Sequence, residues 1–418
     1  MFNQWLECHR TLSNIALGAY TYNSSAHYIN TTLMMTSFFT VDGKHGLNDN
    51  SVMCSLTVPG FEPHWIGVDL GNLFTVFYIV ICAGSNYGFL AARNDLDYLI
   101  VGVSNRSLDV HPPVRGTYDL CAQYPGVVAL KQVVQLNCSS TTPPARYVIL
   151  QQPSNSTGYM SVCEFEVYGT PYGTHRENIL YNKPGTSSSV YYELKTAHQC
   201  GAFSATPVVD GFHDTLFYNC HCGSTDDKSA GANWFMFDLQ GTYYVDHIIF
   251  TARLDYYAGD HRLDNFYVGF SNQPSSVSPP IRNQYPLCGQ WPGYVVPGSK
   301  VLMKCNANLP SFTYLIAQQA LNAADGYFTI CELEAYAPIS RNFLVWKRKF
   351  GFYLSGYRVQ TMSVRSATEC FHQVRQVGGC DSINFNAATK TCELNKHQNG
   401  YNGLVSNASW AFYVVQYN

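Results

Sequence analysis

The sequence predicts a mainly β protein, with two antiparallel β-sandwiches followed by a small α+β domain. Three observations support this prediction. Aromatic residues make up 15% of the chain and include 31 tyrosines, and such residues favour strands. Short runs of strand-forming residues alternate with clusters of Gly, Pro, Asn and Asp, and no long amphipathic helix separates them. The same motifs also occur twice along the chain, at a nearly constant distance.

The composition narrows the class of protein further. The chain has 418 residues, which corresponds to about three domains at roughly 150 residues each. Its 25 Lys and Arg nearly balance its 28 Asp and Glu, which argues against a nucleic-acid-binding protein with a basic surface. The longest uncharged apolar run is residues 74–83. A membrane-spanning helix needs about 20 residues, so we expect no membrane span.

Fifteen cysteines without a Cys-x-x-Cys pair indicate an oxidising compartment. Six Asn-x-Ser/Thr sequons agree, because N-glycans are added to secreted proteins. We therefore expect a secreted, extracellular glycoprotein. Residues 1–13 are an N-terminal extension without the basic and apolar regions of a signal peptide, so either a leader has been removed or the sequence is a fragment. The sequons are at Asn23, Asn30, Asn105, Asn137, Asn155 and Asn407.

An internal repeat organises most of the chain. CEFEVYG at 163–169 returns as CELEAYA at 331–337, an offset of 168 residues. LDYLIVGVSN in the first half returns as LDNFYVGFSN at an offset of 167, and WIGVDLG returns as WFMFDLQG at an offset of 169. Because these blocks keep one order and nearly one offset, we identify residues 14–170 and 178–337 as tandem copies of one domain.

The chain changes character after the second copy, and residues 340–418 are predicted to form a small α+β domain. Ser366 is followed three residues later by Glu369, a pattern that caps the start of a helix. Apolar residues then recur at helical spacing from Phe371 to Val377. DSINFN, a turn at AATKT and CELN predict a β-hairpin, and SWAFYVVQY predicts a closing strand.

The motifs of the two copies resemble those of F-type lectins (fucolectins), a branch of the discoidin-like domains. They are N-I-A-L, VDG, W-x-x-V-D-L-G and the closing C-E-x-E-V-Y-G. The last domain resembles a PAN/apple module through S-x3-C, C-D-S-I-N-F-N and T-C-E-L. The resemblance implies two jelly-roll sandwiches of the galactose-binding-like type, followed by an apple-like domain, and no enzyme among them. The sequence also contains no GxSxG, HExxH, P-loop or GxGxxG motif.

The same resemblance implies a sugar site in the second copy. F-type lectins bind fucose with a His, an Arg-x-Asp motif and a further basic residue. The second copy keeps Arg253 and Asp255, and Arg262 lies seven residues beyond that Asp. Tyr256 and Tyr257 replace the adjacent cysteines of the family as surfaces on which a sugar can stack.

Other family positions of the sugar site are changed. No His stands at the family position, and His221 and His261 are the nearest candidates. In the first copy the corresponding loop has Arg93 as its only basic residue, so we expect that the site is lost there. The alternative for the second copy is that its Arg and Asp residues form a solvated ion-pair cluster at the rim of a sandwich.

A calcium site is the second feature that the resemblance implies. In the family an Asp of the VDG loop and the Glu after the last Cys hold the ion. These positions are Asp42 with Glu164 in the first copy, and Asp210 with Glu332 in the second. Backbone carbonyls would supply the remaining oxygen ligands, as calcium accepts six to eight. The alternative is that each acid caps a turn.

The resemblance and the repeat offsets imply six disulfides and leave Cys8, Cys82 and Cys380 over. We expect a buried free thiol at Cys82, and a partner or a second copy bound through Cys8 or Cys380. Cys380 could instead pair with Cys370 and leave Cys392 free. The implied pairs are Cys54–Cys163, Cys121–Cys138, Cys200–Cys220, Cys222–Cys331, Cys288–Cys305 and Cys370–Cys392.

We interpret the chain as a secreted carbohydrate-binding or adhesion protein that binds glycans or glycoproteins. Five of its six sequons lie in the first copy and none in the second, so the surface of the second copy is left bare for contacts. The alternative is a structural subunit of an extracellular matrix, coat or filament, which self-associates through degenerate lectin domains. High tyrosine content and spare cysteines favour the alternative.

Overall fold

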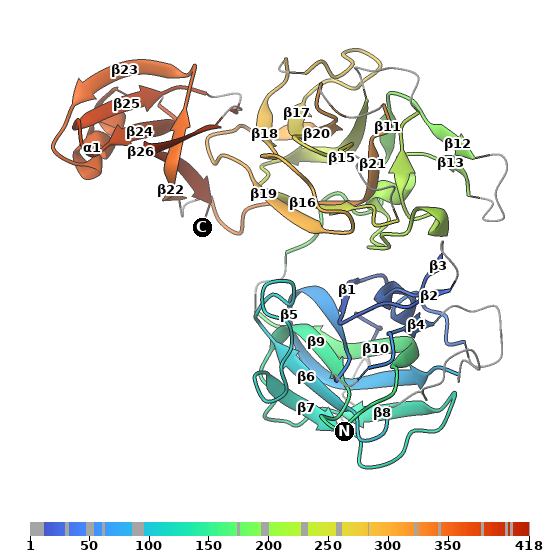
Figure 1. Ribbon diagram of the computed structural model, residues 1–418. Coiled ribbons are helices and arrows are strands. Elements are labelled where there is room, and N and C mark those ends of the chain that lie inside the picture. The colour runs from blue at the N-terminus through green and yellow to red at the C-terminus, as the bar shows by residue number, and fades with distance from the viewer. Residues whose placement is uncertain are drawn as a thin grey trace, which may run out of the picture. The chain divides into compact units, whose positions relative to one another are not determined.

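The structure is a computed structural model, and its chain divides into two compact units, Met1–His175 and Arg176–Asn418 (Figure 1). It is mostly β, with 46% strand and 5% helix. The structure describes residues 12–29, 33–46, 54–60, 63–85, 96–173, 176–193, 200–226, 233–255, 261–282, 284–321, 323, 326–341, 344–377, 380–397, 400–401 and 404–417.

The first unit is an antiparallel β-structure with one short 3-10 helix, η1 (Ser37–Thr40), just before the VDG loop. Its strands are β1 (Tyr20–Asn23), β2 (Tyr28–Ile29), β3 (Leu33–Met34), β4 (Ser55–Leu56), β5 (Trp65–Ala83), β6 (Ile100–Ser104), β7 (Asp119–Gln123), β8 (Val133–Asn137), β9 (Ala145–Gln151) and β10 (Ser161–Pro171). The main strand order is β4-β10-β5-β9-β6-β7, and β1 and β8 also pair with β5.

The long strand β5 takes part in two layers. Its first part pairs with β1 and β9, and its second part pairs with β8 and β10. Ile79 and Ile81 on the second part are fully buried, whereas Phe77 is 42% exposed. This alternation is expected for a strand with one face in the core. One strand thus connects the sheets β1-β5-β9-β6-β7 and β4-β10-β5-β8.

The second unit contains two separate sheets, in the orders β11-β15-β20-β17-β18 and β14-β21-β16-β19, and a hairpin of β12 and β13. Two 3-10 helices, η2 (Thr206–Val209) and η3 (Phe217–Asn219), lie between the strands. The strands are β11 (Gly185–Ser187), β12 (Tyr191–Glu193), β13 (Gly201–Phe203), β14 (Gly223–Ser224), β15 (Trp234–Tyr243), β16 (His247–Ala252), β17 (Tyr267–Ser271), β18 (Leu287–Gln290), β19 (Lys300–Lys304), β20 (Phe312–Gln318) and β21 (Thr329–Tyr336).

The two copies have the same strand order. β5 of the first copy corresponds to β15 and β16 of the second, and each other strand of the two sheets has its counterpart in the same place. Phe235, Phe237 and Phe250 are fully buried in the core of the second copy. The prediction of a mainly β fold with two antiparallel sandwiches is confirmed, because strands that alternate apolar and polar residues bury one face each.

Asp246, between β15 and β16, ties the segment before the second copy to its sheet. Its fully buried carboxylate lies 2.6 Å from Arg176 Nη1, 2.8 Å from Lys304 Nζ and 2.8 Å from His247 Nδ1. Burial raises the pKa of Asp246, but hydrogen bonds from His247, Lys304 and Arg176 outweigh it and lower the pKa to about 2. The charged carboxylate is therefore the stable form in the fold.

The third domain packs one helix on a five-stranded sheet, in the order β22-β26-β24-β25-β23. Its elements are β22 (Leu344–Leu354), β23 (Arg358–Ser363), α1 (Ala367–Val377), β24 (Ser382–Asn386), β25 (Thr391–Asn395) and β26 (Leu404–Tyr417). The Glu369 amide donates to Ser366 Oγ at 3.3 Å, so the predicted cap is confirmed. Phe371 and Val374 pack against the core of this domain. No helix within the described ranges is long and apolar enough to cross a membrane.

Six disulfides join the pairs Cys54–Cys163, Cys121–Cys138, Cys200–Cys220, Cys222–Cys331, Cys288–Cys305 and Cys370–Cys392. Cys82 is free and buried, and it packs with the Cys54–Cys163 disulfide. Cys380 is free and half-buried, and Cys392 is paired, so the alternative pairing of Cys380 with Cys370 is not found. Cys8 lies outside the described residues.

The sequons lie on the surface wherever the structure describes them. The side chains of Asn105, Asn137, Asn155 and Asn407 are exposed, and Asn23 is half-buried. Asn30 lies outside the described residues. Exposed loops and strand ends are the positions at which glycans can be attached, so these sites remain predictions with suitable geometry.

Candidate functional site

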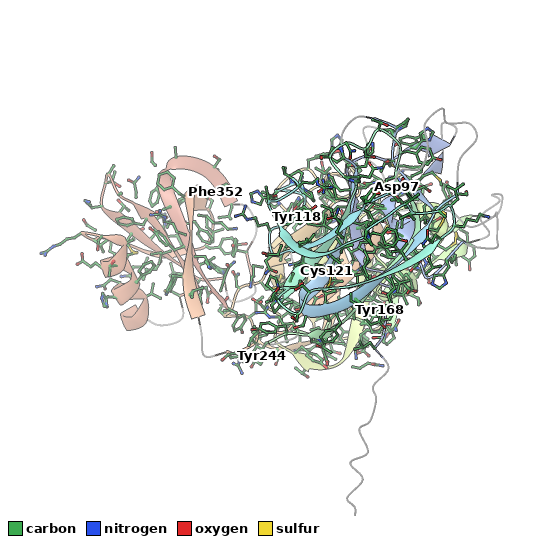
Figure 2. All side chains as sticks on the ribbon, turned by 90° about the horizontal axis from the view of Figure 1, so that it is seen from below. Asp97, Tyr118, Cys121, Tyr168, Tyr244 and Phe352 are labelled. Atoms are coloured by element: carbon green, nitrogen blue, oxygen red, sulfur yellow. A yellow bond between two sulfur atoms is a disulfide. The ribbon has the colours of Figure 1, made fainter. Side chains whose placement is uncertain are left out.

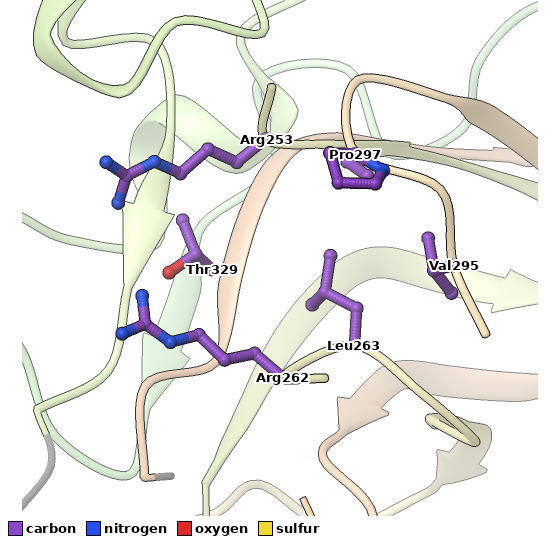
Figure 3. Close-up of a pocket in the computed structure, with 7 residues that line it drawn as sticks. Arg253, Arg262, Leu263, Val295, Pro297 and Thr329 are labelled. Atoms are coloured by element: carbon purple, nitrogen blue, oxygen red, sulfur yellow. The ribbon is translucent and has the colours of Figure 1, made fainter. Parts of the chain in front are cut away.

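A pocket lies in the second copy where the end of β16 meets two loops and the start of β21 (Figure 3). It encloses about 300 Å³, including its open mouth. Two guanidinium groups and one hydroxyl share this hollow with four apolar side chains, a combination that is typical of small-molecule sites. The lining residues are Ala252, Arg253, Arg262, Leu263, Val295, Pro297 and Thr329.

Arg253 is held rigidly by its neighbours. Its Nε donates to the backbone oxygen and to Oδ1 of Asp255, both at 3.0 Å. Its guanidinium carbon lies 4.0 Å from the centre of the Phe217 ring, a cation–π contact. The Phe217 amide donates to the same Asp255 oxygen at 2.9 Å. Because the side chain is already fixed, a ligand would bind it with little further loss of conformational entropy.

Arg262 reaches the same pocket from the following loop. Its guanidinium carbon lies 4.7 Å from the centre of the Tyr327 ring, and its backbone oxygen accepts a hydrogen bond from Gln319 at 3.0 Å. Figure 3 shows the Arg253 and Arg262 side chains extending toward the same side, with Thr329 between them. The two arginines that the Arg-x-Asp pattern singled out therefore face one space.

The other predicted sugar ligands are placed differently. Asp255 supports Arg253 and is absent from the pocket lining. His221 is also absent from the lining, because its Nδ1 lies 2.8 Å from Asp210 Oδ2 and its ring stacks on Phe212. His221 thus belongs to the VDG loop of the second copy, where an acidic partner attracts it. His261 is exposed and pairs with Asp264 at 2.8 Å.

Three residues of the sugar prediction cannot be placed. Tyr256 and Tyr257 lie outside the described residues, and so does the first-copy loop with Arg93. The stacking role of the two tyrosines and the loss of the site in the first copy therefore stay predictions.

The first predicted calcium pair contains a buried carboxylate without hydrogen bonds. Glu164 on β10 is fully buried, and neither of its carboxylate oxygens has a hydrogen-bond partner. Burial and the nearby charge of Asp42 raise the pKa of Glu164 to about 8. Asp42 Oδ1 accepts the amide of Lys44 at 2.9 Å, so this acid also caps its own loop. Two neighbouring acids in a dry environment are unstable as anions unless a cation lies with them.

The second pair repeats this arrangement on β21. Glu332 is fully buried, its Oε2 accepts the Gly211 amide at 3.2 Å, and its Oε1 has no hydrogen-bond partner. Burial, with the charges of Glu334 and Asp210, raises the pKa of Glu332 well above its usual range. The contact with Gly211 sets the VDG loop against the final strand, as the predicted calcium clamp requires.

The residues present fit a calcium ion. Each pair offers two carboxylates, and at least one buried oxygen in each pair is unsatisfied. Across the described ranges no group of three or more His, Cys, Asp or Glu could hold a metal, so backbone carbonyls or waters would complete each site. Calcium accepts such mixed oxygen ligands. The calcium sites stay a prediction.

The residue two places after each buried acid binds a histidine of the VDG loop. Glu166 lies 2.8 Å from His45 Nε2 in the first copy, and Glu334 lies 2.9 Å from His213 Nε2 in the second. These paired contacts hold the loop to the last strand at a second point. The sequence offset of 168 between His45 and His213 could have indicated them.

Sequence reasoning missed several residues around the second site. Thr329 and Tyr327 complete the pocket, and Phe217 supports Arg253 from a Phe-Tyr pair just before the Cys-His-Cys motif. Asp214, four residues after Asp210, is fully buried, and burial raises its pKa to about 7. An acid repeated in the VDG loop was a visible signal for Asp214, whereas nothing in the spacing pointed to Thr329.

Residues 345–413 match the family described as PAN domain. This match runs from β22 into β26, so the third domain is similar to PAN domains, as the resemblance implied. A comparison with curated proteins found no match.

Among solved structures, the chain is similar to an F-lectin (fucolectin) from striped bass serum, with 20% identity over 78% of this chain and 98% of that chain, at a TM-score of 0.32. It is also similar to the fucose binding module SpX-3 of Streptococcus pneumoniae, with 17% identity over 39% and 100% of the two chains (TM-score 0.28). Chitosan-binding module 1 of a Paenibacillus chitosanase/glucanase is 22% identical over 38% and 99% (TM-score 0.28).

Proposed function

We propose that the protein is a secreted, non-catalytic glycan-binding protein, and that its sugar site is the pocket between Arg253 and Arg262. The observation that carries this proposal is that two guanidinium groups from separate segments face one hollow. A sugar ring presents hydroxyl oxygens around its edge and C–H groups on its faces. The pocket offers charged donors and a hydroxyl beside apolar walls, so it is complementary to such a ring.

Each group of the pocket has a defined part in this proposal. Arg253 and Arg262 donate hydrogen bonds to ring hydroxyls, and the Thr329 hydroxyl donates or accepts one more. Leu263, Val295 and Pro297 contact the apolar face of the sugar. Fucose is the proposed sugar, because the Arg-x-Asp motif belongs to the resemblance to F-type lectins. No step of bond making or breaking is involved.

Calcium is proposed as a structural ion in both copies, held by Asp42 with Glu164 and by Asp210 with Glu332. When bound, the ion would supply a charge that neutralises two buried carboxylates. In the second copy, the loop that begins at Asp210 continues to Phe217, which packs against Arg253. Fixing this loop therefore supports the sugar site, and we expect chelation to weaken sugar binding as well as stability.

Secretion is part of the proposal. Six disulfides support an oxidising compartment, because a reduced cytosol would not keep them. The exposed sequons support the same compartment. Self-association, or a disulfide to a partner through Cys8 or Cys380, is proposed with it, since Cys380 is half-buried rather than enclosed.

The second candidate function is a structural subunit of an extracellular assembly. One observation favours it: the first copy keeps its buried pair, Asp42 and Glu164, although its loop has a single basic residue. In this proposal at least one sandwich serves as a building block without a sugar.

A glycan array with and without a calcium chelator tests the first proposal. The parent should bind fucosylated glycans and lose binding in chelator. An Arg253→Ala variant should lose at least about tenfold in affinity, because a charge-assisted hydrogen bond contributes about 1.5–3 kcal/mol. Lys183→Ala, on the same sandwich but bonded to Gln240, is the matched control and should bind as the parent does. A parent that binds no glycan, together with concentration-dependent sedimentation, would favour the structural subunit.

A further inference from the structure

Charge is distributed very unevenly along the chain. Residues 340–418 contain nine Lys or Arg and three Asp or Glu, a net charge of +6. The two sandwiches, residues 14–170 and 178–337, carry −4 and −5. The whole-chain charge of −3 therefore conceals a strongly basic third domain. Such asymmetry indicates a domain that meets an acidic partner.

The basic residues are concentrated on one edge of the sheet. Lys347, Arg348 and Lys349 are consecutive on β22, and all three are exposed. β22 is the last strand of its sheet and pairs only with β26, so its other edge is open within the described residues. At about 3.3 Å per residue, the three charges lie within about 7 Å along the strand.

An exposed aromatic residue continues this basic segment. Phe350 is 71% exposed, and the Arg348 guanidinium lies 5.9 Å from its ring centre. Phe352 is 39% exposed, and Val405, opposite on β26, is 49% exposed. Figure 2 marks Phe352 on this domain. Lysines alone would serve to prevent edge-to-edge aggregation, but an exposed Phe beside them would not, so the segment has the composition of a binding surface.

The acids of the domain do not neutralise β22. The domain has three, and each makes its contacts elsewhere. Glu369 accepts the Arg365 amide at the start of α1, and Glu393 pairs with Arg358 at 3.1 Å. Asp381 accepts the His397 amide. The charge of the basic strand is therefore available to a ligand.

We propose that β22 binds a sulfated acidic polysaccharide along Lys347, Arg348, Lys349 and Phe350. The ligand's sulfate and carboxylate groups pair with the three cations, and one sugar ring lies against the Phe350 face. A linear polyanion fits because the charges form a line on an open edge rather than a closed pocket. This site is distinct from the pocket between Arg253 and Arg262, and its ligand is recognised by charge instead of by hydroxyl geometry.

Binding of the full-length protein to immobilised heparin, measured across salt concentrations, tests the proposal. The parent should bind near 0.1 M salt and lose most of its affinity near 0.5 M, because screening weakens exposed ion pairs. The double variant Lys347→Glu/Lys349→Glu should bind at least about tenfold more weakly. The control Lys390→Glu/Lys396→Glu makes the same charge change on exposed lysines of the same domain and should lose less than about threefold.

Three further arms make the result decisive. Arg262→Ala and added fucose should leave heparin binding unchanged, which separates this site from the proposed sugar pocket. De-sulfated heparin should bind weakly. The proposal is overturned if the parent does not bind heparin, if both double variants lose affinity equally, or if single-stranded DNA of similar charge displaces heparin. Unfolding temperatures of all variants within a few degrees of the parent show that the losses come from the surface and not from the fold.

Discussion

Replacing Asp246 by Asn tests how the second unit is held together. The change keeps the size of the side chain but removes the charge that Arg176, Lys304 and His247 surround. Removing one partner of a buried ion pair costs about 3–5 kcal/mol. Arg176 and Lys304 are 19% and 31% exposed and can recover some hydration, so we expect the lower end, about 3 kcal/mol. For a unit of this size, that lowers the unfolding temperature by roughly 6–12 °C.

The pH dependence of stability gives a second, independent measure of the same residue. The pKa of Asp246 is about 2 in the fold, against an ordinary value of 3.8. Between these values the unfolded chain binds the proton first, so the stabilisation is complete above about pH 4 and is lost as the pH falls toward 2. The difference corresponds to about 2.4 kcal/mol. The Asn variant should lack this part of the acid sensitivity.

Urea unfolding of both proteins at pH 7, and thermal unfolding from pH 5 to pH 2, are the measurements. Asp238→Asn is the matched control, because Asp238 is half-buried and its carboxylate accepts the Gln240 amide at 2.8 Å. The control should lose no more than about 1 kcal/mol. An Asp246→Asn protein as stable as the control at pH 7, with an unchanged acid transition, would refute the reasoning.

Three further predictions concern other parts of the chain. A calcium chelator should lower the unfolding temperature of the parent, since an ion at a hundred times its Kd stabilises by about 2.7 kcal/mol, and Glu332→Gln should reduce this effect in calorimetry. Arg262→Ala should weaken fucoside binding by at least about tenfold in titration calorimetry without a loss of stability. Burial lowers the pKa of His397 to about 4, so the third domain should lose about 3 kcal/mol as the pH falls from 6.5 to 4, seen as faster amide exchange; no change in exchange would contradict this.

The features that the sequence predicts well are those set by short-range geometry or by repetition. Cys121 and Cys138 are 17 residues apart, as are Cys288 and Cys305, and both pairs form disulfides. Equal loops in two copies leave little freedom for other pairings. The helix cap at Ser366 is similarly local, because one hydroxyl and one amide within a single turn decide it.

The features that the sequence does not predict depend on which side chains meet across loops. Arg253 lies on Phe217, 36 positions earlier in the chain, and His221 turns to Asp210 instead of the sugar pocket. Spacing in a motif does not encode such choices, since they follow from burial and from the nearest opposite charge. The division of β5 into two strands in the second copy is similar in kind. It coincides with Asp246, a poor strand former that stands where the first copy has Phe77.

The burial of Cys82 gives the first unit its own internal probe. The thiol is 1% exposed, and burial, with the charges of Glu166 and Glu164, raises its pKa to about 11. A thiol-specific reagent can therefore modify it only when the surrounding strands separate. Cys380, half-buried in the second unit, should react without such opening. Timed alkylation followed by peptide mass spectrometry can thus time the opening of the first sandwich in the intact chain, without any engineered label.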